Sequence, residues 1–209
     1  MTTLYYGPGA CSLAPHIALE ETGAPFDTVR VVLAEGQQLK PEYLAVNPRG
    51  RVPALVVDGK LLTEAAAILA YVARRYPEAG LLPDDPWEQG QAFSWMGFLA
   101  SSVHIAFAGI WRPARFAGDA EVHPELQKTG RATVERYFAE IEERLAGREW
   151  ALSRYSVVDP YLLVFYRFGL RVGLPMAERF PEWTRHAARM QERPAVQRVL
   201  AREGIAIAP

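Results

Sequence analysis

The sequence predicts a two-part α/β protein, in which a small mixed sheet covered by helices precedes an all-helical domain. Short β-prone runs alternate with helical segments as far as residue 76. Residues 77–86 then hold three prolines and a glycine, and beyond them the apolar spacing is helical. The 209 residues are enough for one large or two small domains with a buried core.

The first part is expected to form alternating strands and helices. The predicted strands cover residues 2–6, 26–33, 54–57 and 60–62. The predicted helices cover residues 13–22, 41–46 and about 64–76. Asp58-Gly59 joins the last two strands as a hairpin, so parallel and antiparallel pairing should occur in one sheet.

The second part is expected to contain helices only. They cover residues 87–110, 123–146, 157–172, 181–193 and 194–202, with proline or glycine between them. We therefore place a first domain at residues 1–78, a linker at 79–86 and a helical domain at 87–209.

Composition excludes several classes of partner. Lysine and arginine total 23 and aspartate and glutamate total 24, so no overall positive charge favours nucleic acid or an anionic membrane. Arginine outnumbers lysine but is scattered along the chain, and we attribute this skew to coding bias. A single cysteine, no export signal and no apolar run approaching about 18 residues indicate a cytoplasmic protein.

Cys11 is the first candidate for chemistry. It follows a strand and the loop Gly7-Pro8-Gly9 and precedes a helix, where free backbone N–H groups and the helix dipole favour a thiolate. The alternative is a small buried hydrophobic residue. Ser12 could cap the helix or donate to a thiolate. Ala14 stands where a dithiol motif needs its second cysteine, so an internal dithiol cycle is excluded.

Two further segments are candidates for ligand binding. Val52-Pro53 opens a strand, where an extended ligand could pair with the backbone of Val52; the alternative is an ordinary trans proline ending a loop. Thr63-Glu64-Ala65 precedes a helix, whose N–H groups could bind a carboxylate while Glu64 accepts an ammonium group. Alternatively, Thr63 caps the helix and Glu64 complements its dipole.

Together these segments resemble the glutathione transferases, and most closely the bacterial beta class. The resemblance is carried by LYYGPGACSLAPH at residues 4–16, NPRGRVPAL at 47–55 and LTEAAAIL at 62–69. It implies a thioredoxin-like N-terminal domain and an all-helical C-terminal domain. It also implies a cis Pro53, pairing of Val52 with the cysteinyl backbone of glutathione, and binding of the γ-glutamyl end by Glu64 and Ala65.

The resemblance extends into the helical domain. His104 matches the histidine that beta-class enzymes present toward the cysteine, although by itself it would suit a hydrogen-bonded core position. Ile105 and Ser102 depart from the class, which suggests a more apolar substrate side. Residues 156–159 resemble the family's capping box, with Asp159 as cap and Pro160 first in the helix as the competing register. The resemblance also implies a homodimer through the third helix and the helix from Trp87.

The resulting prediction is a glutathione transferase that conjugates small hydrophobic electrophiles in detoxification. The glutathione thiol would have to lose about two pKa units, or about 2.7 kcal/mol, which exceeds what a helix terminus supplies. Cys11, Ser12 and His104 are the predicted donors, and Phe98, Phe107 and Trp111 the predicted apolar walls. No histidine has metal-ligand spacing, so no metal is predicted.

Three alternatives stay open at this point. Cys11 could form a mixed disulfide with glutathione and exchange it, as a glutaredoxin does. The same site could serve a glutathione-dependent isomerase or dehalogenase. A carrier that binds glutathione or another ligand without catalysis would have the same fold.

Overall fold

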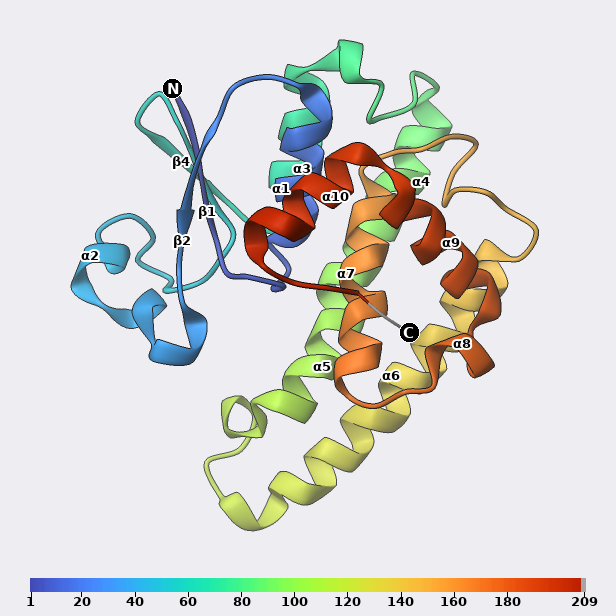
Figure 1. Cartoon of the computed structure of the whole chain (residues 1–209). Coiled ribbons are helices and arrows are strands. Elements are labelled where there is room, and N and C mark those ends of the chain that lie inside the picture. Colours follow the sequence, from blue (N-terminus) through green and yellow to red (C-terminus); the bar gives the residue numbers. More distant parts are fainter. Residues whose placement is uncertain (208–209) are drawn as a thin grey trace.

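The computed structural model describes residues 1–207 and contains the predicted mixed sheet (Figure 1). Its strands are β1 Thr2–Tyr6, β2 Asp27–Arg30, β3 Ala54–Val57 and β4 Lys60–Thr63, in the order β2-β1-β3-β4. β1 pairs parallel with β2 and antiparallel with β3, and β4 completes the hairpin. β2 is shorter than predicted because Leu33–Glu35 turns into a 3₁₀ helix that ends on Gly36, which has a φ of 67°.

Three helices accompany the sheet: α1 Leu13–Thr22, α2 Pro41–Leu44 and α3 Ala65–Arg75. Residues 13–19 of α1 are all buried. Their burial follows from the position of α1, which contacts β1 and α3 on one side and α7 and α10 of the helical part on the other. A helix enclosed in this way buries side chains all around its axis rather than along one stripe.

The helical part contains seven helices within the described residues. They are α4 Pro86–Phe98, α5 His104–Trp111, α6 His123–Leu145, α7 Val158–Arg171, α8 Met176–Arg179, α9 Pro181–Glu192 and α10 Pro194–Glu203. The sequence prediction missed α8, whereas its single helix over residues 87–110 is confirmed as the segment that contains α4 and α5. A π-helical turn at Leu99–Val103 links these two helices into one continuous rod, and such turns are frequent beside functional sites.

The continuous rod corrects one sequence prediction. Pro86–Trp111 spans 26 residues, and its most apolar 18-residue window has a mean hydropathy of 1.4 with 33% of that window buried. By length and composition alone it could cross a membrane, which contradicts the prediction that no apolar run approaches about 18 residues. Gly97 and Gly109 lie inside the rod without ending it. The rod packs along α6, and core helices of soluble proteins have the same length and composition.

The first turn of α7 is held by a buried aspartate. Asp159 Oδ2 accepts from the Ser156 N–H at 2.7 Å, and Oδ1 accepts from the Ala151 N–H at 2.9 Å. His186 Nε2 lies 2.9 Å from the same Oδ1. The capping box is therefore confirmed. The competing register, with Pro160 first in the helix, is wrong because α7 begins at Val158.

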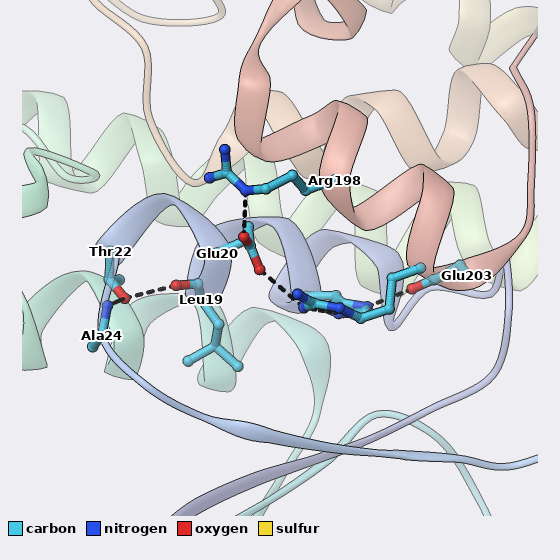
Figure 2. A network of polar contacts seen from close by, with 8 residues as sticks. Leu19, Glu20, Thr22, Ala24, Arg198 and Glu203 are labelled. Atoms are coloured by element: carbon cyan, nitrogen blue, oxygen red, sulfur yellow. Dashed lines mark hydrogen bonds and ion pairs between the residues drawn. The ribbon is translucent and has the colours of Figure 1, made fainter.

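The last helix, α10, fastens the helical part to α1 (Figure 2). Glu20 of α1 accepts from Arg198 at 2.6 Å and from Arg202 at 2.9 Å. Glu203, fully buried, lies 2.7 Å from His16 Nδ1 and accepts the Gly9 N–H at 2.7 Å. The chain end thereby supports the loop that precedes Cys11.

Candidate active site

A cleft of about 580 Å³ lies between the sheet and the helical part. One wall comes from the sheet side and includes Cys11, Val52, Pro53, Glu64 and Ala65. The other wall comes from the helical side and includes His104, Ile105, Trp111, Tyr161 and Phe168. The structure thus brings together all but one of the predicted site residues, although more than 90 positions separate Cys11 from His104.

Cys11 lies half-buried in the loop that leads into α1, and its S–H donates to the Val52 carbonyl at 3.4 Å. Burial raises the pKa of the Cys11 thiol to about 11, and the backbone N–H of Cys11 offsets this only in part. The prediction that this position favours a thiolate is therefore wrong for the free protein. Desolvation outweighs the helix terminus, and Cys11 is a neutral hydrogen-bond donor near pH 7.

Ser12 is the predicted residue that does not reach the cleft. Its side chain is fully buried, donates to the Gly7 carbonyl and accepts the Gly7 N–H, both at 3.1 Å. This corrects its assignment as a catalytic donor. Ser12 closes the loop in front of α1 by accepting the Gly7 N–H, while the Gly7 carbonyl also accepts the Ala10 N–H at 3.0 Å.

Val52 and Pro53 lie opposite Cys11, and the peptide bond between them is cis. The preceding carbonyl, that of Arg51, accepts from Tyr43 Oη at 2.6 Å and from Asn47 Nδ2 at 2.7 Å. Two side chains therefore hold the strand that faces the cleft. The sequence does not predict these two hydrogen bonds, because its only local sign of them is the turn-like pair Asn47-Pro48.

The N-terminus of α3 opens into the cleft without a side-chain cap. Glu64 occupies the cap position with a φ of 69°, a left-handed conformation that is costly for a residue other than glycine. Its carboxylate pairs with Arg49 at 3.0 Å and is largely exposed. Thr63 belongs to β4, so the alternative in which it caps the helix is wrong.

His104 is the first residue of α5, directly after the π-helical turn. Its ring lies 5.7 Å from that of Phe165 and 6.0 Å from that of Phe168. Burial and the charges of Arg115 and Arg112 lower the pKa of His104 to about 4. At neutral pH it is therefore an uncharged imidazole with one N–H to donate.

Of the predicted apolar wall, only Trp111 lines the cleft. Phe107 is fully buried and stacks against Trp111 with 4.9 Å between ring centroids. Phe98 packs edge-on against Tyr137 on the α6 side. Phe107 is a core residue and Phe98 is a partly buried residue packed against the core, and helical spacing alone could not tell which face of the rod they occupy.

Arginine side chains gather at the cleft, although they are scattered along the sequence. Six line it: Arg30, Arg49, Arg51, Arg112, Arg115 and Arg171. Among the described residues, Glu64 is the one acidic side chain in the lining. The six come from four separate segments of the chain, so no local sequence signal could reveal their convergence. Within residues 1–207, no three His, Cys, Asp or Glu side chains are placed to hold a metal ion.

Comparisons with known proteins agree with this geometry. Residues 1–74 match the family described as glutathione S-transferase, N-terminal domain. The glutathione S-transferase GstA of Escherichia coli O157:H7 is 36% identical over 206 residues, covering 97% of this chain and 98% of that protein.

Solved structures extend the likeness to the whole fold. A glutathione transferase homologue from Sulfitobacter, with bound glutathione, is 36% identical with a TM-score of 0.93 and covers 99% of both chains. The beta-class glutathione S-transferase of Sphingomonas chungbukensis is 37% identical with a TM-score of 0.86. It covers 98% of this chain and 100% of its own.

Proposed function

This chain belongs to the glutathione S-transferase family and acts as a glutathione transferase, and from this premise we propose how its cleft works. Glutathione binds along the sheet-side wall. Its thiolate attacks a small hydrophobic electrophile that rests against α5 and α7. The observation that carries this proposal is the meeting of Cys11, Val52, Glu64 and His104 in one cleft.

The backbone of Val52 offers the main attachment for the tripeptide. Its carbonyl would accept the cysteinyl N–H of glutathione, in the manner of strand addition. That carbonyl now accepts the Cys11 S–H. When the cysteinyl N–H occupies this carbonyl, the S–H would be able to turn to the glutathione sulfur instead.

The γ-glutamyl end fits the opening of α3. Uncapped N–H groups at Ala65 and beyond suit its α-carboxylate, and the exposed carboxylate of Glu64 suits its ammonium group. The strained φ of Glu64 places both features at the same point on the cleft wall.

Two neutral donors then stabilise the thiolate. Lowering the thiol pKa by about two units takes about 2.7 kcal/mol, and hydrogen bonds to charged groups are worth about 1.5 to 3 kcal/mol each. The Cys11 S–H and one His104 N–H are available, whereas Ser12 is committed to Gly7. The cleft arginines add positive charge on the same side.

The neutral Cys11 favours conjugation over disulfide exchange. Exchange requires Cys11 as an attacking thiolate, and a pKa of about 11 leaves little thiolate at pH 7. A protonated thiol is suited to donating a hydrogen bond instead.

Turnover of a chlorodinitrobenzene with glutathione, measured with variants of Glu64, tests the proposal. We expect Glu64→Gln to raise the KM for glutathione about tenfold, because a charge-assisted contact to the ammonium group is lost. The matched control is Glu42→Gln, an exposed glutamate of α2 outside the cleft. Saturable glutathione binding with no turnover of any electrophile would instead identify a carrier.

The wider setting follows as part of the same proposal. We place the domains at 1–78 and 87–209 with a linker at 79–86, and the protein in the cytoplasm with a role in detoxification.

A homodimer would cover apolar side chains near α3 and α4: Trp87 is 74% exposed, Phe93 42% and Leu61 41%. Sedimentation showing only a 23.3 kDa species at micromolar concentration would refute the dimer.

A further inference from the structure

The helical wall of the cleft carries an excess of positive charge. Arg112 and Arg115 follow α5 directly, and Arg171 is the last residue of α7. Arg51 faces them from the sheet side, and partial burial together with the charges of Arg51 and Arg112 lowers the pKa of Arg115. These guanidinium groups therefore lie close enough to repel one another.

No carboxylate of the described chain relieves this repulsion. Within residues 1–207, no aspartate or glutamate lies within salt-bridge distance of Arg51, Arg112, Arg115 or Arg171. Glu64, the one acid in the lining, is already paired with Arg49. Like charges that converge on a cleft without a counterion are the arrangement that binds an anion.

Glutathione alone does not account for the charge. Bound as the thiolate it brings two carboxylates, one sulfur anion and one ammonium group, and six arginines line the cleft. Its γ-glutamyl end lies at Glu64 and Ala65 in the proposed pose. That end is on the sheet side, away from the helical wall that carries Arg112 and Arg115.

We propose that the electrophile itself carries a negative group, a carboxylate, on an otherwise apolar body. Arg112 and Arg115 bind the carboxylate, for which the planar guanidinium is geometrically matched. Trp111 and Phe168 contact the apolar body. This inference rests on the proposed transferase function and replaces a purely apolar electrophile with an amphipathic anion.

The neighbouring groups suit this substrate. His104 is uncharged at neutral pH, so it donates a hydrogen bond without competing for the carboxylate. The arginines are exposed at the mouth of the cleft, where they also attract an anion from solution. Arg171 lies 5.3 Å from the Trp111 ring centre, which places its charge beside the apolar surface.

Binding of two glutathione conjugates tests the inference. Both are S-aryl glutathiones with the same nitrophenyl ring, one with a para carboxylate and the other with a para carboxamide. By titration calorimetry we expect the carboxylate conjugate to bind about tenfold more tightly, with the difference shrinking as salt is added. Equal affinities, or tighter binding of the carboxamide, would overturn the proposal.

Variants assign the effect to the arginines. Arg115→Gln should reduce the carboxylate-to-carboxamide preference to about one, whereas Arg148→Gln, an exposed arginine outside the cleft, should keep it near ten. An unchanged preference in Arg115→Gln contradicts the proposal. If Arg115→Gln loses affinity for glutathione alone to the same extent, the proposal is also contradicted, because Arg115 would then bind the tripeptide.

Turnover measured beside binding separates the two proposals. If the carboxylate preference holds but no electrophile reacts, the transferase mechanism fails and the anion site stands. If conjugation proceeds without any carboxylate preference, the mechanism stands and the anion site is wrong.

Discussion

The two walls of the cleft are built by different means. The sheet-side wall presents two backbone features, the Val52 carbonyl and the open N-terminus of α3, beside side chains such as Cys11. The helical wall presents side chains, above all His104, Arg112 and Arg115. A backbone wall is set by the fold and suits an invariant ligand such as glutathione. A side-chain wall changes with one substitution and therefore sets the choice of second substrate.

The walls also differ in how they are held. Tyr43 and Asn47 hold the sheet-side strand through the Arg51 carbonyl, and Ser12 closes the loop before α1. The helical wall relies on the buried Asp159 at the start of α7. Glu203 of α10 joins the two through Gly9 and His16. Substitutions at these points can weaken one wall at a time.

The largest effect is expected from Asp159→Ala, which removes the support of the helical wall. Two backbone N–H groups, of Ala151 and Ser156, lose their acceptor in the buried interior, and His186 loses its partner. We expect the free energy of unfolding in urea to fall by about 3 to 5 kcal/mol. Glu143→Ala, exposed on α6, should change it by less than about 0.5 kcal/mol. A loss below about 1 kcal/mol for Asp159→Ala would contradict this account.

The junction between the walls is tested by Glu203→Gln. The amide keeps one acceptor, but it cannot serve both the Gly9 N–H and His16 as the buried carboxylate does. We expect a loss of about 1 to 3 kcal/mol in unfolding free energy, with weaker glutathione binding because Gly9 leads to Cys11. The control is Glu192→Gln, which changes an exposed side chain of α9. Full stability with unchanged glutathione affinity would show that the junction does not support the loop.

His104→Ala removes a donor from the helical wall while leaving the sheet-side wall intact. We expect kcat/KM to fall about tenfold or more, mostly in kcat, because the donor acts on the thiolate. Because the pKa of His104 is about 4, the ring is neutral throughout the range from about pH 5.5 to 8. Wild type and variant should then share one pH profile in that range. An inflection near the ordinary histidine pKa that disappears in the variant would contradict a neutral His104.

The smallest effect is expected from Cys11→Ala, on the sheet side. Conjugation should fall less than about tenfold, since His104 remains as a donor. Disulfide exchange, if present, should vanish, because Cys11 is the single cysteine. Iodoacetamide should label wild-type Cys11 slowly at pH 7, with the rate still rising with pH at pH 9, because the thiol pKa is about 11. Rapid labelling at pH 7, or equal loss of exchange and conjugation, would contradict the donor role.

Sequence reasoning located most of the sheet side, because its determinants are local. The strand pattern, the Asp58-Gly59 hairpin and the loop before Cys11 each depend on neighbouring residues, and the structure has them within a few positions of the prediction. The parallel pairing of β1 with β2 likewise follows from the helix between them. Ser12 was misplaced because a cap and an inward loop closure have the same sequence signature.

The helical side was predicted less completely. Helix bounds follow from periodicity, but the face that each residue occupies depends on how helices pack. Phe107 is therefore a core residue and Phe98 packs against the core, while Trp111 lines the cleft. The π-helical turn before His104 leaves no mark in the sequence, although the single helix predicted over residues 87–110 matches the continuous rod that this turn completes.

The sequence by itself determined the family, the two kinds of secondary structure and the sheet-side segments that line the cleft, since these depend on short motifs and local periodicity. The tertiary structure alone decided the charge states of the site residues and which side chains surround them. Burial makes Cys11 a neutral donor and keeps His104 uncharged, and burial depends on residues far away in the chain. The arginines of the cleft converge only when six separate positions are folded together. Desolvation and long-range charge are properties of the packed molecule, so no local pattern encodes them.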